Sequence, residues 1–443
     1  MRTMHTTAKI KGWMQAVSAV LLTATLVACG GGGGSDNSSS SSSNNSNPPS
    51  LLNGGSLPAS PTQQPIAATA TNTVPVTVGQ GASGVINIPT VSVTICAPGS
   101  TTNCQTINNV QLDTGSFGLR VVGSALNSSL LGALPVSTLS GSSAQLAECA
   151  TFADGYTWGS VRTATIAIGG ESTASAIPIQ IIGDKDASTV PAQGCSNSGG
   201  SAENTVSDLG ANGILGVGTA PTDCGATCVN ASTAATYSNY YACPGGTSCA
   251  RTAVSLAQQV ANPVANFPDG SNNGVIVQMP PLPDAGAPSA SGTLVFGIGT
   301  QSNNALAASQ VFTTDAYGDM NNSTFNGATV QAFLDSGSNG YFFADSTLAL
   351  CGSSFAGFYC PSSAQTRSVT LVGLNKTTAA VSIGIANAQT LFGNGGNYAF
   401  NDLAGQIGGN SSFDLGLPFF YGRHVYYGFD RTATGGSAPY VGF

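Results

Sequence analysis

The chain has 443 residues, enough for two or three domains of ordinary size, and only 7% of them are charged. Its 19 Asp and Glu outnumber 11 Lys and Arg, which argues against nucleic acid as a partner because phosphate binding requires clustered cations. The scarcity of Lys, Arg and Glu also argues against long surface helices, whereas 58 glycines with abundant Ser, Thr, Asn and Val favour strands joined by turns.

Residues 1–28 are typical of an export signal peptide. Basic residues near the start are followed by an apolar stretch, residues 17–27, that is too short to span a bilayer as a helix. The stretch ends in Leu-Val-Ala-Cys, which resembles the lipobox of bacterial lipoproteins and implies cleavage before Cys29 and lipidation of its thiol. An ordinary secretory signal with a chance Cys is the alternative. The lipobox interpretation predicts a lipid anchor in the bacterial cell envelope, and Gly30, which is no acidic retention signal, favours the outer membrane.

Low-complexity sequence follows at residues 29–70. Runs of Gly, Ser and Asn give way to a stretch rich in Pro, Ala and Thr, and neither composition can bury a core. We therefore expect a flexible tether over residues 29–70. The folded part is expected to form an N-terminal lobe over residues 71–299, with a flap and a Cys-rich insertion, and a C-terminal lobe over residues 300–443.

Strand-like runs come at short intervals from Asn72 onward. Residues 164–170 (ATIAIGG) alternate in polarity and residues 293–297 (TLVFG) form an apolar run, and both end in Gly, which is a β signature. The best helical candidate is the segment over residues 251–264, which stops near Pro263. The sequence therefore predicts a mainly β protein.

The cysteines agree with an oxidising compartment. Of 11 Cys, ten remain once Cys29 is set aside, and several are close neighbours in sequence. The simplest pairing joins Cys96 to Cys104, Cys224 to Cys228, Cys243 to Cys249, Cys351 to Cys360, and the remaining Cys149 to Cys195. A zinc site built from the four cysteines between 224 and 249 is the alternative, although their spacings are not those of the usual zinc motifs.

Two motifs place an acidic residue at the end of an apolar run. They are LDTGSFGLRV, which contains Asp113, and FLDSGSNGYFF, which contains Asp335. A carboxylate in such a place is costly to desolvate unless it is hydrogen-bonded or used. Each motif is followed by an apolar-apolar-Gly element, at residues 214–216 and, less perfectly, at residues 414–416. Two copies of one half-site would explain this spacing.

The chain lacks the residues that other kinds of catalytic site or metal site require. The histidines are His5, in the predicted signal, and His424, so a multi-histidine metal site is excluded. The chain contains neither the Gly-x-Ser-x-Gly of a nucleophile elbow nor the Gly-Lys-Ser/Thr of a phosphate loop. We expect His424 to be a structural hydrogen-bonding residue. Carboxylates are left as the candidates for catalysis.

The order of these and further motifs resembles the pepsin-like aspartic peptidases. In that family a flap hairpin follows the first Asp-Thr-Gly, and residues 152–170 match it; an Asp-Gly-Ile-Leu-Gly element follows, matched with Asn first at residues 212–216. The Gly-x-Leu-x-Phe-Gly that closes the first lobe matches residues 292–297. The C-terminal Leu-Gly-x-x-Phe and Tyr-x-x-Phe-Asp match within residues 414–431. Within the family, the chain is similar to a branch of exported bacterial proteins of unknown function.

The resemblance implies a two-lobed pepsin-like β-barrel architecture with a cleft between pseudo-symmetric lobes. Asp113 and Asp335 would form a catalytic dyad there and share one proton, because two adjacent carboxylates cannot both ionise. One would act as general base on a water while the other protonates the scissile carbonyl, and neither role is assigned because a coupled pair titrates as a unit. The resemblance assigns support of the dyad to Thr114, Gly115, Ser116, Ser336, Gly337 and Ser338, and the flap to Phe152, Asp154, Gly155 and Tyr156. It implies a peptide or protein substrate and neither cofactor nor metal.

Two departures from the family pattern concern the flap. Phe152 stands where the family has a Tyr, and Arg120 stands where the family has the Trp that hydrogen-bonds this Tyr. Tyr156, on the same hairpin, is a candidate substitute. The alternative function is therefore a pepsin-fold protein that binds a peptide or protein without cleaving it, with the cleft blocked by the Cys-rich insertion at residues 221–249. A β-rich envelope adhesin or scaffold is a third hypothesis, which leaves the paired Asp motifs unexplained.

Overall fold

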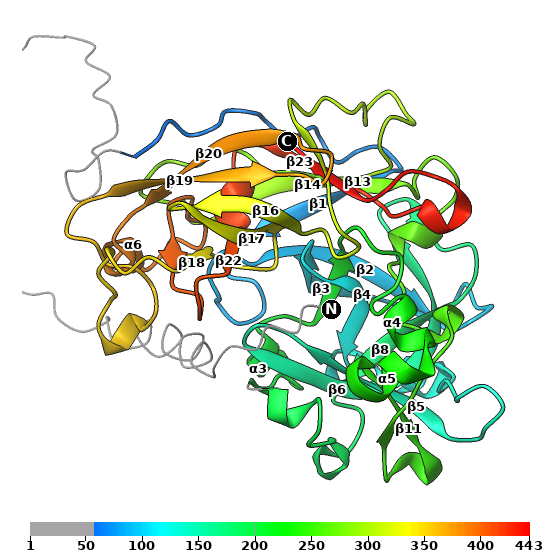
Figure 1. The fold of residues 1–443 in the computed structure, drawn as a ribbon. Helices are drawn as coiled ribbons and strands as arrows, with labels where there is room; N and C mark the ends of the chain where they lie inside the picture. Colours follow the sequence, from blue (N-terminus) through cyan, green and yellow to red (C-terminus); the bar gives the residue numbers. More distant parts are fainter. Residues whose placement is uncertain (1–56, 199) are drawn as a thin grey trace, which may run out of the picture.

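The computed structural model describes residues 57–198 and 200–443, so the predicted signal peptide, Cys29 and most of the predicted tether lie outside the described residues. The described chain is mainly β, with one closed six-stranded barrel and one nearly closed seven-stranded barrel. Figure 1 shows the strands of the second barrel (yellow to orange) above the cyan and green strands of the first. The predicted mainly β, two-lobed architecture is confirmed.

The strands fall into two sheets within the described residues. The larger sheet contains β1 (Thr73–Val78), β2 (Pro89–Cys96), β3 (Cys104–Asp113), β4 (Phe117–Val122), β5 (Gln145–Thr151), β6 (Gly155–Ile168), β7 (Glu171–Ser172), β8 (Ile177–Ile182), β9 (Ser201–Ala202), β10 (Gly213–Val217), β11 (Tyr240–Cys243), β12 (Ala250–Arg251), β13 (Gly274–Gln278), β14 (Ala290–Phe296), β15 (Val311–Thr313), β23 (His424–Gly428) and β24 (Tyr440–Gly442). The second contains β16 (Met320–Phe325), β17 (Ala328–Asp335), β18 (Tyr341–Phe343), β19 (Gln365–Val372), β20 (Thr378–Ile385), β21 (Ala404–Gly405) and β22 (Ser412–Gly416).

The α-helices of the described chain are short. They are α2 (Ser128–Ala133), α3 (Val206–Leu209), α4 (Ala226–Val229), α5 (Ala231–Tyr237) and α6 (Ala388–Phe392). Within residues 57–198 and 200–443, none of the helices has the length and apolar character needed to cross a bilayer. The predicted helix over residues 251–264 is wrong: only single 3-10 turns form there, because Arg251 pairs in β12 with β11 and Ala261 donates to the carbonyl of Pro178.

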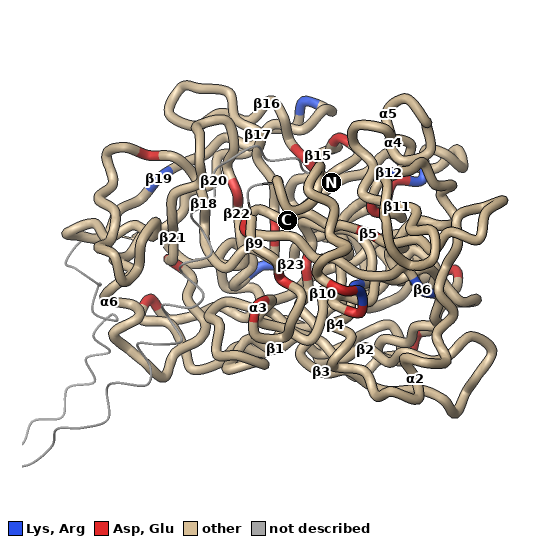
Figure 2. Tube along the Cα trace, turned by 90° about the horizontal axis from the view of Figure 1, so that it is seen from below, with Lys and Arg blue, Asp and Glu red and all other residues tan. Residues whose placement is uncertain are grey.

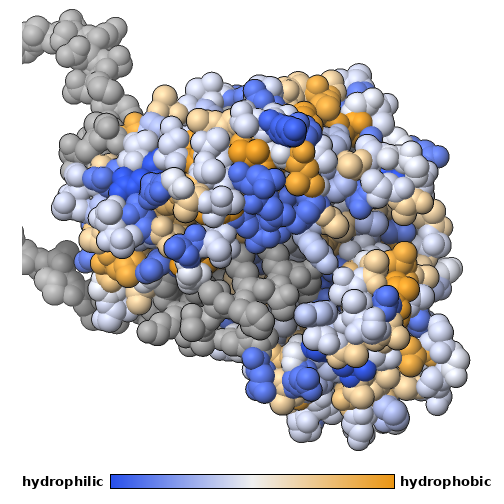
Figure 3. All heavy atoms as spheres, in the orientation of Figure 1, coloured by the Kyte–Doolittle hydropathy of each residue, from blue (hydrophilic) through white to orange (hydrophobic). Residues whose placement is uncertain are grey.

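Alternating polarity explains the individual strands. In β1, Val74, Val76 and Val78 are buried while Pro75 and Thr77 are exposed, as expected when successive side chains point to opposite faces. Burying each such Val stabilises the fold by about 1.5–3 kcal/mol. Charged residues are sparse along the chain trace (Figure 2), and exposed apolar residues form small separate patches on the face in Figure 3. The large exposed apolar side chains of the described chain are Val229, Tyr237, Leu256, Leu306, Leu350 and Leu374.

The two sheets contain the same local arrangement of strands. β3 lies parallel to β10, with Asp113 opposite Gly216, and β17 lies parallel to β22, with Asp335 opposite Gly416. The strand after each Asp, β4 or β18, returns antiparallel to β10 or β22. Both glycines are needed sterically; a Cβ at Gly416, for example, would lie 2.1 Å from the carbonyl oxygen of Gly340. The repeated motifs in the sequence therefore fold as two copies of one half-site.

Hydrogen bonding between strands also crosses the predicted lobe boundary at residue 300. β23 pairs with β13, and β24 pairs with both β15 and β23, so the last strands of the chain complete the larger sheet. The C-terminal part of the chain thus contributes to both sheets.

The end of the predicted tether is part of the folded body. The Nε2–H of His424 donates a hydrogen bond to the carbonyl oxygen of Gln64 (2.8 Å), and the backbone N–H of Ile66 donates to the side-chain oxygen of Gln278 (2.9 Å). The carbonyl of Ile66 also accepts from the Thr293 hydroxyl (2.6 Å). The expectation of a flexible segment up to residue 70 is wrong for residues 57–70, because composition does not reveal that backbone groups find partners on β13, β14 and β23. The prediction that His424 is structural is confirmed.

All five predicted disulfides are confirmed. The structure pairs Cys96 with Cys104, Cys149 with Cys195, Cys224 with Cys228, Cys243 with Cys249, and Cys351 with Cys360. The four cysteines of the alternative zinc site therefore form two disulfides. Loops closed in this way restrict the unfolded chain, which stabilises the insertion through two short loops and flap strand β5 through the Cys149–Cys195 disulfide, whose sequence separation is 46.

Candidate active site

The two half-sites bring Asp113 and Asp335 together. Each Asp is the last residue of its strand, β3 or β17, and both line the same cavity. A Cβ at Gly115 would lie 2.4 Å from the carboxyl carbon of Asp335, and a Cβ at Gly337 would lie 2.7 Å from that of Asp113. Glycine at these two positions therefore allows each carboxylate to sit against the backbone of the opposite loop.

Thr114 and Ser336 join the two loops by reciprocal hydrogen bonds. The backbone N–H of Thr114 donates to the Ser336 hydroxyl (3.1 Å), and the backbone N–H of Ser336 donates to the Thr114 hydroxyl (2.9 Å). The Ser336 hydroxyl in turn donates to the carbonyl of Leu112 (2.7 Å). Both side chains are buried, so these bonds are not exchanged with water. These reciprocal bonds lock the two dyad loops together, in agreement with the supporting role that the resemblance implies for Thr114 and Ser336.

Each carboxylate receives a matching backbone hydrogen bond. The N–H of Gly115 donates to Asp113 Oδ1, and the N–H of Gly337 donates to Asp335 Oδ1, both at 2.8 Å. Ser338 Oγ lies 3.2 Å from Asp335 Oδ2. The Ser116 hydroxyl lies against Asp113 and favours its ionised form, although the contact lacks the geometry of a regular hydrogen bond.

The proton affinity of the pair is raised. Burial, the charge of Asp335 and a hydrogen bond between the two carboxyl groups together raise the pKa of Asp113 from 3.8 to about 7, with burial as the largest cause. Asp113 is 7% exposed, which explains why burial is the main cause. Because coupled carboxyls titrate as a unit, the pair holds one shared proton up to about neutral pH.

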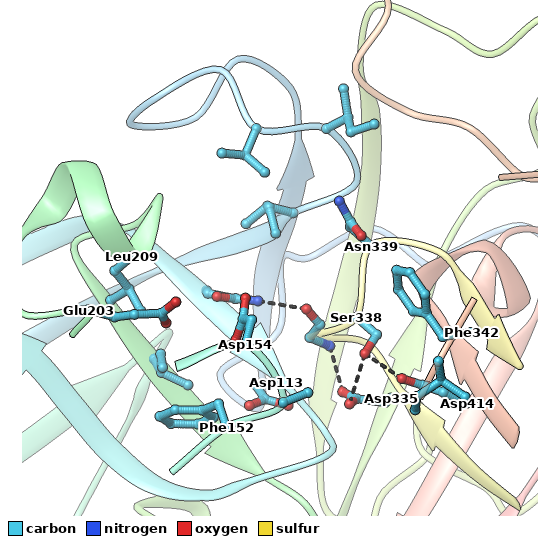
Figure 4. Close-up of a pocket in the computed structure, with 18 of the residues that line it drawn as sticks. Asp113, Phe152, Asp154, Glu203, Leu209, Asp335, Ser338, Asn339, Phe342 and Asp414 are labelled. Atoms are coloured by element: carbon cyan, nitrogen blue, oxygen red, sulfur yellow. Dashed lines mark hydrogen bonds between the residues drawn. The ribbon is translucent and has the colours of Figure 1, made fainter. Parts of the chain in front are cut away.

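A cavity opens over the dyad, and a second, smaller cavity adjoins it. Both lobes supply walls, and Figure 4 shows Asp113 and Asp335 at the base, with Phe152 on the first-lobe side and Phe342 on the other. The apolar wall residues of the larger cavity are Val85, Ile86, Ile88, Phe152, Ala153, Leu209, Ile214, Phe342, Phe358 and Ile407. Its carboxylates are Asp113, Asp154, Glu203, Asp335 and Asp414.

The predicted flap is the hairpin of β5 and β6. Phe152 and Asp154, between the strands, line the cavity, and the N–H of Phe152 donates to the carbonyl of Gly155 (2.8 Å). Gly155 also leaves room for Glu203, since a Cβ there would lie 2.6 Å from the Glu203 carboxyl. The suggestion that Tyr156 substitutes for the family's Tyr is wrong. Its ring is 8% exposed and clusters with Trp158 and the Cys149–Cys195 disulfide, where burial stabilises it, so it does not line either cavity.

Arg120 belongs to a buried ionic cluster beside the dyad. Its guanidinium donates to Glu148 on β5 and to Asp223 (3.2 Å), and Asp223 also accepts a hydrogen bond from the Tyr240 hydroxyl on β11. Arg120 and Asp223 line the smaller cavity. Burial raises the pKa of Glu148 well above its usual range, against the opposing effect of Arg120. The cluster ties the strand after the dyad loop to the flap strand and the Cys-rich insertion. An Arg in the otherwise apolar run FGLRVV was the only sequence signal for it.

The Cys-rich insertion at residues 221–249 does not fill the two cavities. Of its residues, Asp223 lines the smaller cavity, while Cys224, Cys228 and Tyr240 pack in a separate apolar cluster. Within the described part of the chain, no group of three or more His, Cys, Asp or Glu side chains has the geometry to hold a metal ion.

Sequence analysis missed Asp414 as a member of the site. Its side chain is 4% exposed, lines both cavities, and accepts a hydrogen bond from Ser338 (2.6 Å). The rule that singled out Asp113, an acidic residue at the end of an apolar strand, would also have found Asp414, which was treated only as an imperfect copy of the apolar-apolar-Gly element.

The chain belongs to a family described as "Protein of unknown function (DUF3443)", whose model matches residues 68–443. The match covers both half-sites and the flap. A comparison with curated proteins found no match. The function is therefore argued from the geometry of the site.

Proposed function

We propose that this protein is a pepsin-like aspartic endopeptidase that hydrolyses peptide bonds with water activated by Asp113 and Asp335. The observation that carries the proposal is the buried carboxyl pair, which is held by two interlocked Asp-Thr/Ser-Gly loops at the base of an open cavity. A carboxylate with a purely structural role would be paired with a cation or hydrogen-bonded within its own turn alone. Here each carboxylate also sits against the opposite loop and shares a proton with the other carboxylate.

The geometry supports general acid–base chemistry. With one proton on the pair, one carboxylate accepts a proton from a water between them as the water attacks the scissile carbonyl. The protonated partner donates to the carbonyl oxygen, which becomes tetrahedral. The backbone N–H groups of Gly115 and Gly337 hold the inner oxygens in place throughout, so the pair need not reorganise during the reaction.

The shape of the cavity favours an extended peptide as substrate. Its apolar side chains come from both lobes and from the flap, so a chain lying across the dyad would place side chains in pockets on either side of the scissile bond. The upper pH limit should lie near neutrality, since the pair holds its proton up to about pH 7. The predicted export signal and the resemblance to a lipobox support a further part of the proposal, that the enzyme acts as a lipid-anchored protein of the bacterial cell envelope.

One observation favours a second function, that of a pepsin-fold protein that binds a peptide without cleaving it. The aromatic flap residue that lines the cavity is Phe152, which has no hydroxyl, and Tyr156 does not replace it. The flap therefore presents no aromatic hydroxyl to the cavity, although the Asp154 carboxylate also lines it.

A peptide library incubated with the full chain from pH 4 to pH 8 tests the proposal. Asp113→Asn and Asp335→Asn should each abolish cleavage, because either change removes the shared proton while nearly preserving shape. Asp269→Asn is the matched control and should cleave like the parent, because Asp269 is exposed and lines neither cavity. An inhibitor with a hydroxyl at the position of the attacking water should block cleavage. Folded protein that cleaves nothing but still binds the inhibitor would establish the binding function instead.

A further inference from the structure

One of the positions at which the two half-sites differ faces the cavity from the apolar-apolar-Gly element. In β10 the residue two before Gly216 is Ile214, and in β22 the residue two before Gly416 is Asp414. Both glycines lie opposite a dyad Asp, and both Ile214 and Asp414 line the larger cavity. The equivalent positions of the two half-sites can therefore be compared directly: the second lobe has a carboxylate where the first lobe has an aliphatic side chain.

Asp414 is connected to the dyad through Ser338. The Ser338 hydroxyl oxygen lies 2.6 Å from Asp414 Oδ2 and 3.2 Å from Asp335 Oδ2 (Figure 4). A hydroxyl has one proton to donate, and the shorter distance is typical of a hydroxyl that donates to an ionised carboxylate. Ser338 then presents a lone pair to Asp335, which suits a protonated Asp335 that donates a hydrogen bond and disfavours an ionised one.

Among the described residues, the Ser338 hydroxyl contacts two carboxylates, those of Asp335 and Asp414. The remaining charged side chains that line the two cavities are Asp154, Glu203, Arg120 and Asp223. Arg120, the one cation among these lining residues, is bonded to Glu148 and Asp223. Asp414 is therefore distinguished from the other carboxylates by the hydroxyl that it shares with Asp335, and not by its charge alone.

We propose that Asp414 acts through Ser338 as a positioning residue of the dyad and holds the Asp113–Asp335 pair in its singly protonated form. The inference rests on the proteolytic function proposed above. A negative charge next to the pair, together with the donation of the Ser338 proton to Asp414, opposes loss of the proton that the pair shares. In a site with Ile at both positions, Ser338 would be free to donate to Asp335, and the pair would lose its proton at lower pH.

The first test is the pH profile of peptide cleavage by Asp414→Ile and Asp414→Asn. Asp414→Ile introduces the side chain of the first lobe, and Asp414→Asn keeps the shape if the Ile variant folds poorly. The upper pH limit of activity should move down by about one pH unit in both variants. This is the lower end of the pKa shift that a neighbouring charge typically causes. In a protein that already carries Ser338→Ala, the same Asp414 variants should shift the upper pH limit by less, because the link from Asp414 to Asp335 through Ser338 is then already broken.

Asp154→Asn is the matched control for this profile, since it removes another carboxylate from the same cavity and leaves both contacts of the Ser338 hydroxyl, to Asp335 and to Asp414, in place. Its upper pH limit should stay close to that of the parent. An unmoved limit in both Asp414 variants, or an equal shift in Asp154→Asn, would overturn the proposal in favour of a general field from the acidic cavity.

A second test does not depend on proteolysis. The difference in unfolding free energy between Asp113→Asn and the parent should change with pH as the pair loses its proton, and the midpoint of that change should move to lower pH when both proteins also carry Asp414→Ile. A moved midpoint without any cleavage would refute the proposed function but support the role of Asp414. An unmoved midpoint, with or without cleavage, would refute the role of Asp414.

Discussion

Replacing Asp113 by Asn should make the protein more resistant to unfolding at neutral pH while abolishing its proposed activity. Burial raises the pKa of Asp113 from 3.8 to about 7, so between these values the native state holds a proton that the unfolded state releases. The parent therefore loses stability as pH rises through this window. At about 1.4 kcal/mol for each pH unit, the loss amounts to about 4 kcal/mol. Below pH 3.8 both states are protonated and the contribution vanishes.

Asn has no proton to lose, so the variant escapes this loss. The difference in unfolding free energy between Asp113→Asn and the parent should shift in favour of the variant by about 4 kcal/mol between pH 4 and pH 8, whatever fixed penalty the amide brings. Urea unfolding of both proteins, with disulfides intact, measures the difference at each pH. Asp269→Asn serves as the exposed control. A difference that is the same at pH 4 and pH 8 would refute the shared-proton argument.

Three further changes test other parts of the molecule. Asp402→Asn should be more stable than the parent at pH 8 but not at pH 4, because burial, with a contribution from Asp284, raises the pKa of Asp402 to about 7; equal thermal melting shifts at both pH values would contradict this. Phe152→Tyr should leave peptide cleavage unchanged or raise it, since it restores a flap hydroxyl, and a large fall in kcat/KM would show that the cavity needs the apolar edge. Cys29→Ser should release the protein from the membrane fraction with its fold intact, and unchanged membrane association in cell fractionation would contradict the lipobox interpretation.

Local sequence patterns were sufficient for the fold class and for much of the dyad. Alternating polarity in segments such as β1 depends only on neighbouring residues, and so does the choice of near cysteines as disulfide partners. The Asp-Thr/Ser-Gly motifs were recognisable because the Asp, the hydroxyl residue and the glycine are consecutive in the sequence. The helix predicted over residues 251–264 failed for the opposite reason: its backbone groups bond to other strands, to β11 and to Pro178 on β8, instead of to one another.

The sequence by itself determined that this is a mainly β protein with two half-sites, each of which supplies one carboxylate. These features depend on residues that lie within short contiguous stretches of the chain. Only the tertiary structure decided what surrounds those carboxylates. Ser338 and Asp414 are 76 residues apart and Arg120 and Asp223 are 103 apart, yet each pair is hydrogen-bonded in the site. Such contacts form because strand pairing and burial bring distant segments together, and the protonation of a buried carboxyl group is set by those neighbours and not by its own position in the chain.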